Sequence, residues 1–145
     1  MADDHAGGEP GIPIMELAFD SGTLNAVRAG VKAHACRAGL PKERAEDVVL
    51  AVHELAANAV SHGAGAGRLR IWKLAEALHC EVEDGEPLAS GTPAGHSWPS
   101  LPGHGLWLVR QVADRMRIRS GLRGTRATVA FDLPGRRKGP GCLQA

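Results

Sequence analysis

Apolar side chains recur with helical spacing over residues 41–61, which carry the clearest pattern in the chain. At about 100° per residue these side chains fall into one stripe, as in an amphipathic helix that packs against a core. Pro41 suits the first turn of such a helix, because the N–H that proline lacks would have no acceptor there. The segment therefore predicts a core helix. The stripe consists of Val48, Val49, Val52, Leu55 and Ala59.

Two further helices are expected on either side of this one. Asp20 or Ser21 can cap the first, which runs to about Arg37, and Gly39 ends it. The other covers residues 105–114, where apolar side chains again predominate.

Alternating apolar and polar residues predict strands elsewhere, with a tight turn at Ala75-Glu76 and a closing hairpin around residues 121–124. The order of strand, two helices, two strands, loop, helix and two strands is typical of an α+β protein. We expect a two-layer α/β sandwich, with helices on one face of a mixed, mainly antiparallel sheet. The expected strands are residues 14–19, 68–73, 77–83, 115–120 and 126–133.

The chain is expected to form one domain, from residue 14 to residue 134. Residues 1–13 are interpreted as a flexible leader and residues 135–145 as a flexible tail, because glycine and proline are frequent in the first and nothing periodic occurs in the second. Residues 86–102 are too rich in proline for a regular element and predict a long surface loop.

Composition narrows the class of protein. The 145 residues are 43% apolar and 23% charged, which suits one globular domain. A net charge of +1 gives no general attraction to nucleic acid or to a membrane surface, and we expect neither as a partner. The three cysteines are far apart and lack metal-ligand spacing, which favours reduced thiols and a cytoplasmic location. The N-terminus lacks a signal-peptide pattern, and no apolar run is long enough to span a membrane.

Candidate chemistry is concentrated on the core helix. Glu54, Asn58 and His62 lie at i, i+4 and i+8 and form a polar ridge beside the apolar stripe. Asparagine is a poor residue for the middle of a helix, so that Asn58 suggests a specific role. A carboxylate and an amide oxygen are ligands that Mg²⁺ accepts.

Two other motifs are less specific when taken alone. Gly103-His104-Gly105 precedes an apolar helix, where free N–H groups can approach an anion, although an ordinary loop-to-helix turn has the same pattern. Asp84 follows a strand and could accept a hydrogen bond from a ligand amine, although it could equally be an acidic turn residue. Gly124-Thr125 begins the last strand and could add a hydroxyl group nearby, although a hairpin turn explains this pair equally well.

Taken together and in this order, these motifs resemble the Bergerat-type (GHKL) ATP-binding family shared by gyrase, histidine kinases and MutL. The resemblance covers roughly residues 14–133 and is strongest to the anti-sigma factor serine/threonine kinases of the RsbW and SpoIIAB type. Glu54 to Asn58, with the trailing His62-Gly63, is similar to the N box of that family. Asp84 falls in its first glycine box, Gly103-His104-Gly105-Leu106 in its second, and Gly124-Thr125 in its last conserved element.

The resemblance implies a role for each matching residue. Asn58 would coordinate Mg²⁺, and Glu54 would orient or deprotonate the attacking hydroxyl group. Asp84, followed by Gly85, would bind the adenine amino group, and Thr125 would assist through water. The second glycine box would cradle the phosphates under an ATP lid formed by residues 86–102. The cradle consists of Gly103, His104, Gly105 and Leu106.

The sequence departs from the family pattern in two places. The usual Asp-x-Gly-x-Gly becomes Asp84-Gly85-Glu86-Pro87, so the turn beneath the adenine must differ. Residues 86–102 contain no lysine or arginine, so the phosphate charge would be balanced by Mg²⁺, backbone N–H groups and the histidines His96 and His104. Since phosphoryl transfer depends on charge neutralisation, this departure bears on catalysis more than on binding.

The resemblance implies an ATP-binding regulator that sequesters a sigma factor and phosphorylates a serine on a STAS-type anti-anti-sigma protein. It also implies a homodimer and a partner-facing arginine at Arg28. The first alternative is a nucleotide-gated binding module of the same fold without kinase activity. A detached histidine kinase domain would need a phosphoacceptor helix for which this chain has no room. A nucleic-acid binder would use the arginines of residues 115–126, although solvated charge on a strand explains them too.

Overall fold

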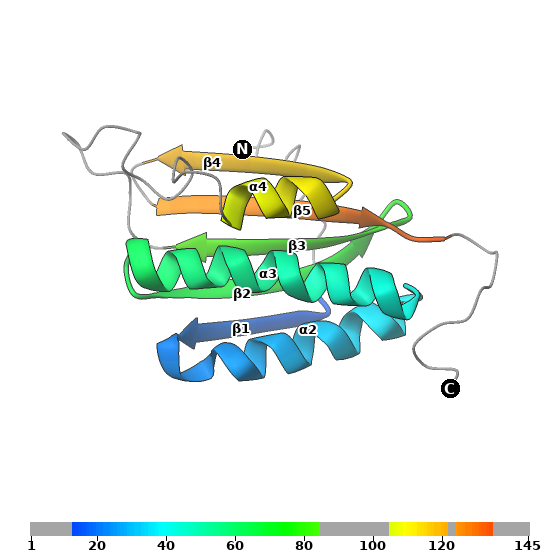
Figure 1. Cartoon of the computed structure of the whole chain (residues 1–145), viewed down its shortest axis with the longest axis horizontal. Coiled ribbons are helices and arrows are strands. Elements are labelled where there is room, and N and C mark those ends of the chain that lie inside the picture. Colours follow the sequence, from blue (N-terminus) through cyan, green and yellow to red (C-terminus); the bar gives the residue numbers. More distant parts are fainter. Residues whose placement is uncertain (1–12, 85–104, 122–123, 135–145) are drawn as a thin grey trace.

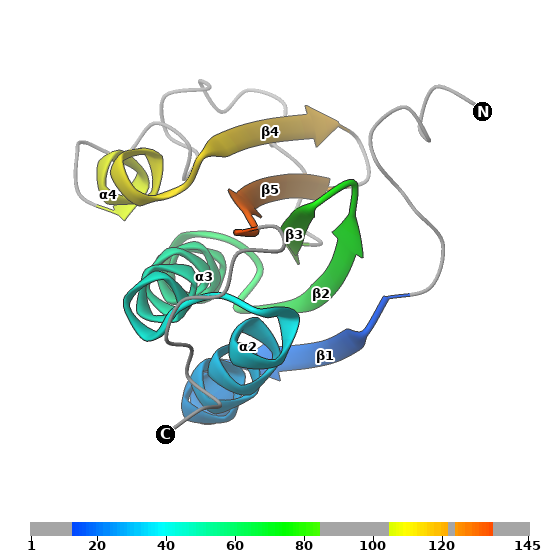
Figure 2. The same ribbon diagram turned by 90° about the vertical axis from the view of Figure 1, so that its right-hand side faces the viewer.

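A computed structural model of the chain describes residues 13–84, 105–121 and 124–134. The described part has two layers, a sheet and a set of helices that cover one of its faces (Figures 1 and 2). The expected leader (1–13, apart from Pro13), loop (86–102) and tail (135–145) lie outside the described residues.

Within the described residues the sheet has five strands, in the order β1-β2-β3-β5-β4. Every pairing between described strands is antiparallel, and the expected α+β sandwich with helices on one face is confirmed. All five of these strands were expected, with ends that differ by at most two residues. The strands are β1 (Met15–Asp20), β2 (Ala66–Leu74), β3 (Ala77–Asp84), β4 (Arg115–Gly121) and β5 (Gly124–Asp132).

In the described part of the chain, three α-helices and a short 3-10 helix form the second layer. Asp20 caps the 3-10 helix η1 (Ser21–Thr23), since its Oδ1 accepts a 2.9 Å hydrogen bond from the N–H of Gly22. Gly39 ends α2 with a φ of 109°, in the left-handed region that favours glycine. No helix in the described ranges is long and apolar enough to cross a membrane. The α-helices are α2 (Leu24–Ala38), α3 (Lys42–His62) and α4 (Gly105–Val112).

Helix α4 ends two residues before the expected position. The N–H of Asp114 donates to the carbonyl oxygen of Ala130 at 3.0 Å, so the chain has already joined the sheet there. A sequence pattern cannot show where a backbone N–H exchanges a helical acceptor for a strand acceptor.

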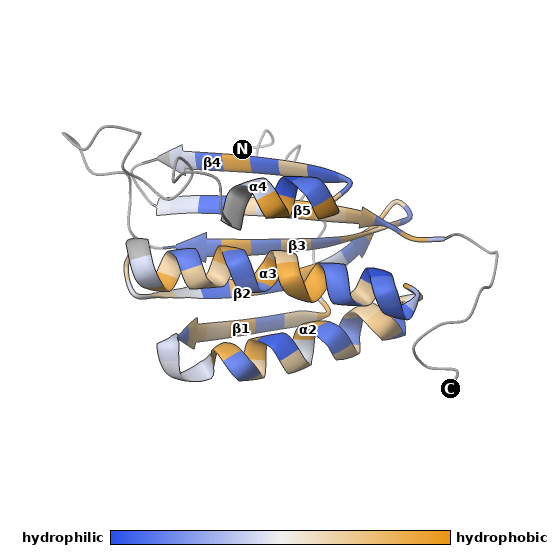
Figure 3. Cartoon of the chain, viewed as in Figure 1, coloured by the Kyte–Doolittle hydropathy of each residue, from blue (hydrophilic) through white to orange (hydrophobic). Residues whose placement is uncertain are grey.

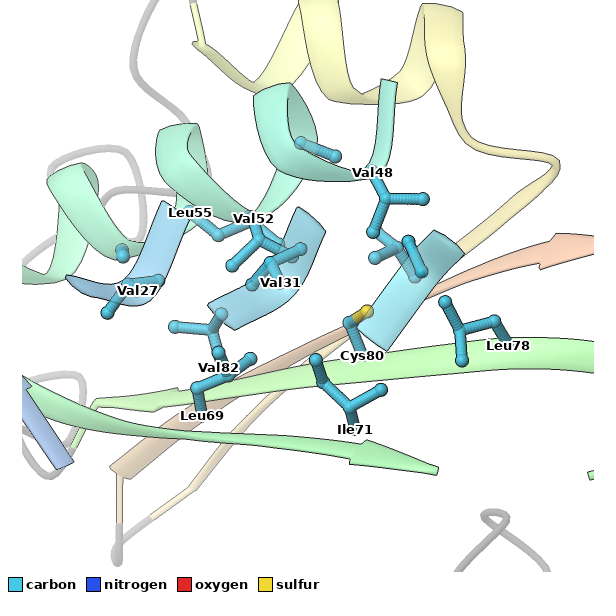
Figure 4. Packing of buried hydrophobic residues seen from close by; sticks show 14 of the residues in the cluster. Val27, Val31, Val48, Val52, Leu55, Leu69, Ile71, Leu78, Cys80 and Val82 are labelled. Carbon is cyan, nitrogen blue, oxygen red and sulfur yellow. The ribbon is translucent and has the colours of Figure 1, made fainter. Parts of the chain in front are cut away.

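The core lies between the helices and the inner face of the sheet, and α3 is its central helix. Val48, Val52 and Leu55 are fully buried, and Figure 4 shows them near side chains from β2 and β3. Apolar positions on α3 alternate with polar ones around the helix, as the colours of Figure 3 show. The predicted apolar stripe of α3 is therefore the core-facing side of this helix, with Val49 only partly buried at its margin.

The cysteines differ in their chemical state. Cys80 on β3 is a free thiol, and full burial raises its pKa to about 12, so it remains protonated at neutral pH. Cys36 on α2 is disulfide-bonded, with its partner outside the described residues. The expectation of reduced thiols is thus correct for Cys80 and wrong for Cys36, because cysteines distant in sequence can meet in a folded chain. The cytoplasmic location stays a prediction.

Arg44 joins α3 to the end of α4 and to the sheet. Its Nη1 donates to the carbonyl oxygen of Val112 at 2.8 Å, and its Nη2 donates to Asp114 at 3.0 Å. The guanidinium also lies 4.9 Å from the centre of the Phe131 ring on β5. The last carbonyl groups of a helix need hydrogen-bond donors from outside it, and Arg44 provides one for Val112. This bond fixes where the end of α4 lies against α3.

The β2–β3 turn is strained. Ala75 has a φ of 51° and Glu76 a φ of 70°, which is the left-handed region that side chains with a Cβ disfavour. A two-residue hairpin turn of this kind normally contains Asn-Gly. The expected turn is present, but without the residues that make it favourable.

Replacing the turn with Ala75→Asn and Glu76→Gly is expected to raise the free energy of unfolding by about 1–2 kcal/mol, because both residues then tolerate a positive φ. Urea denaturation measures the change. Glu76→Ala is the control, since alanine keeps the strain while removing the charge. A gain of the same size in the control would contradict the explanation from backbone strain.

Candidate functional site

The ends of several helices and strands meet at one end of the sandwich. Helix α3 and strand β3 end there, and α4 and β5 begin there, at the left of Figure 1. Free N–H groups at the start of a helix and side chains at strand ends can therefore face the same volume. Most of the residues expected to form the site lie on these elements.

Asp84 occupies the centre of this end of the sheet and is completely buried. Its Oδ1 accepts a hydrogen bond of 3.1 Å from the N–H of Ala64, two residues beyond the end of α3. A buried carboxylate is costly unless it is hydrogen-bonded, and this bond fixes its position. An acidic turn residue, the alternative interpretation of Asp84, would instead be exposed to solvent.

Gly63 allows the backbone after α3 to reach Asp84. A Cβ on Gly63 would overlap the carboxylate of Asp84 and would also lie 2.9 Å from the carbonyl oxygen of Ala59. The φ of Gly63 is −116°, so the requirement for glycine comes from this close approach and not from the backbone conformation. Gly63 thus belongs to the site because it leaves room for the carboxylate.

A row of residues crosses the sheet at Asp84. Thr125 on β5 is the cross-strand neighbour of Asp84, and Ser120 on β4 is the neighbour of Thr125. The hydroxyl oxygens of Ser120 and Thr125 are 3.3 Å apart, and Thr125 is buried. On the other side of Asp84 lies Gly67, where a Cβ would meet the carbonyl oxygen of Glu83 at 2.5 Å. The structure therefore brings together Asp84 and Thr125, as expected.

Two residues in this row, Ser120 and Gly67, were not expected from the sequence. Their place in the site follows from the strand register, which pairs residues that are far apart in sequence. No local motif marks either residue. The alternation of β4, which places Ser120 on the same face as Ile118, was the one available signal.

Glu54 and Asn58 lie one turn apart on α3. Both side chains are half-buried, unlike the fully buried Leu55 between them. The polar ridge expected from the sequence is therefore partly shielded and partly accessible, as a ligand-binding side chain must be.

Other expected site residues are less fully described. Gly105 and Leu106 are the first residues of α4, and His62 is the last residue of α3. Gly85, Gly103 and His104 lie outside the described residues, as does the expected ATP lid. Arg28 is exposed on α2. Among the residues that the structure describes, no three His, Cys, Asp or Glu side chains are grouped as metal ligands.

Comparison with known families agrees with this arrangement. A family model of the histidine kinase-like ATPase domain matches residues 17–131. The chain belongs to this family, and the resemblance to Bergerat-type ATPases inferred from its motifs is confirmed. Membership implies ATP binding, usually together with Mg²⁺.

Solved structures share the fold. One is the crystal structure of the RsbU and RsbW domains of Rv1364c from Mycobacterium tuberculosis, with a TM-score of 0.60 and 23% sequence identity over 83% of this chain. The chain spans 32% of the length of that protein chain. At this identity the similarity concerns the fold. Comparison with curated protein sequences found no significant match.

The residues present are suited to a nucleotide and a magnesium ion. The absence of a side chain at Gly63 leaves room for the buried carboxylate of Asp84. A carboxylate fixed in this way can accept a hydrogen bond from an amine such as that of adenine. The amide oxygen of Asn58 is a hard oxygen ligand of the kind that Mg²⁺ prefers.

Gly63→Ala is expected to lower the free energy of unfolding by about 1–3 kcal/mol, because its methyl group must displace the Asp84 carboxylate and disturb the bond to Ala64. Urea denaturation measures the loss. Gly22→Ala is the matched control, since a Cβ there would make only an ordinary 3.5 Å contact with Asp20. Equal stability of the two variants would contradict the proposed close approach.

Proposed function

We propose that the protein is an ATP-binding anti-sigma regulatory factor of the cytoplasm. In this proposal it sequesters a sigma factor and phosphorylates a serine on a STAS-type anti-anti-sigma protein. The observation that carries it is the buried Asp84, hydrogen-bonded to the backbone just after α3, the helix on which Glu54 and Asn58 lie. The shared fold with a chain containing an RsbW domain supports the choice of this branch of the family.

Each residue has a role in the proposal. Asp84 accepts a hydrogen bond from the adenine amino group, with Gly85 beside it, and Thr125 assists through a water molecule. Asn58 contributes its amide oxygen to magnesium. The start of α4, Gly105 and Leu106, together with Gly103 and His104, binds the phosphates through backbone N–H groups. Bound ATP supplies the phosphoryl group.

Glu54 is the proposed general base. It accepts the proton of the serine hydroxyl as the serine oxygen attacks, which leaves a phosphoserine and ADP as products. Its half-buried position on α3, one turn before Asn58, would place the carboxylate beside the magnesium-binding amide.

The proposal also includes partner binding. The exposed position of Arg28 on α2 is compatible with a sigma-factor contact. The protein is further proposed to act as a homodimer.

A second candidate function is a nucleotide-gated binding module without kinase activity. It is favoured by one sequence feature, the absence of lysine and arginine from residues 86–102. Without a cation in this segment, charge that builds on the transferred phosphoryl group would be less well stabilised.

Phosphoryl transfer is tested with purified protein, labelled ATP, Mg²⁺ and candidate STAS proteins. Glu54→Gln is expected to slow transfer by about 10²–10⁴-fold while ATP still binds, because only the base is lost. Asn58→Ala is expected to lose transfer through loss of the metal contact. The control is Glu46→Gln, the same change at a solvent-exposed position of α3 that pairs with Lys32.

The result separates the candidate functions. A labelled STAS protein with the parent and the control, but not with Glu54→Gln, supports the kinase. Nucleotide binding by the parent without transfer to any STAS protein selects the nucleotide-gated module. Equal transfer by the parent and Asn58→Ala would contradict the assignment of the site.

A further inference from the structure

Strand β4 lies at an edge of the sheet. In the described residues it pairs only with β5, so one row of its backbone N–H and C=O groups faces away from the sheet. Such an edge can pair with another extended chain. Met116 and Ile118 pack against the core, so the alternate residues of β4 point to the outer, helix-free face.

Three of these positions along β4 are arginines: Arg115, Arg117 and Arg119. Arg115 donates to Asp132 at 2.8 Å, whereas Arg117 and Arg119 have no carboxylate within ion-pair distance among the described residues. The cross-strand neighbour of Arg119 is another arginine, Arg126. Like charges directly opposite each other are unfavourable, so this edge carries an excess of positive charge.

The rest of the outer face is neutralised by ion pairs. Arg68 lies 3.4 Å from Glu16 across β1 and β2, and Arg126 lies 3.7 Å from Glu83 across β5 and β3. The opposite edge strand, β1, thus has an acidic residue already paired with a neighbouring arginine. The excess charge is a local feature of β4. Figure 3 shows the alternating hydrophilic and hydrophobic positions along this strand.

A hollow of about 330 Å³ adjoins the arginines. Arg115 and Arg117 line it together with Thr128 and His79, which come from the neighbouring strands. The ring of His79 stacks on Trp72 at 5.6 Å, with 4° between the planes, so that one wall is rigid. Burial lowers the pKa of His79, and the positive charge of the hollow at neutral pH therefore comes from the arginines.

We propose that the outer edge of β4 binds an acidic, extended segment of a partner protein, which adds a strand to the sheet. Its backbone pairs with the free edge of β4, and its carboxylates reach Arg117 and Arg119, with one side chain entering the hollow beside Thr128. Thr128 and Arg117 face outward, whereas Thr125 and Asp84 face the helices, so this surface is separate from the proposed nucleotide site and does not depend on it.

Two other occupants fit less well. A second copy of this chain, paired through β4, would place arginines against arginines, which is unfavourable. A single-stranded nucleic acid would match the charge, but no aromatic residue is interleaved with the arginines of β4 to stack on bases. An acidic strand uses both the charge and the free backbone of the edge.

The test is a fluorescence anisotropy titration of the full chain with a fluorescent peptide. The peptide alternates valine and glutamate and has the same number of residues as β4. The parent is expected to bind it, and the double variant Arg117→Glu, Arg119→Glu to bind it at least about tenfold more weakly. The matched control is Lys73→Glu, an exposed strand position on β2, which is expected to bind like the parent. Equal binding by the parent and the double variant would overturn the proposal.

Two more peptides separate charge from strand pairing. A peptide of valine and lysine is expected to bind the double variant and not the parent, which also shows that the variant is folded. The glutamate peptide with alternate N-methyl groups is expected to lose binding, because it cannot pair with the strand edge. Undiminished binding of the methylated peptide would overturn strand addition. Tighter binding of an oligothymidylate than of the glutamate peptide, falling steeply with salt, would replace the proposal with a nucleic-acid site.

Discussion

The contact between the Asp84 carboxylate and the backbone that follows α3 is the interaction on which the rest of the site depends. A buried carboxylate is destabilising unless hydrogen bonds compensate for lost hydration, and the N–H of Ala64 provides one. That bond is possible only because Gly63 has no side chain at the point of closest approach. The end of α3 is therefore held against the end of β3, and the amide of Asn58 is carried to the same end of the sandwich.

Arg44 fixes the other end of α3. Its hydrogen bonds to Val112 and Asp114 hold the end of α4, so α3 is attached to the sheet at one end through Asp84 and to α4 at the other. Between these two points lie Glu54 and Asn58. A polar ridge held in this way is preorganised, which is what an electrostatic site requires, because side chains that need not reorganise stabilise charge more effectively.

Much of the fold could be predicted from the sequence because its elements have clear periods. The stripe of α3 and the alternation of β2 and β3 reflect burial on one side, and Asp84, Thr125 and Asn58 occur in recognisable motifs. Ser120 and Gly67 could not be predicted, because they join the site through cross-strand register, which no local pattern encodes. The disulfide of Cys36 was missed for a similar reason, since it depends on a contact distant in sequence.

The most direct test of the account is a calorimetric titration of Mg²⁺–ATP into the parent protein and Asp84→Asn. Saturable binding by the parent and a large loss of affinity in the variant are predicted. The NH₂ group of asparagine is a donor, so it cannot accept a hydrogen bond from the adenine amino group or from the N–H of Ala64. Binding of equal strength by both proteins, or no binding by the parent, would contradict the account.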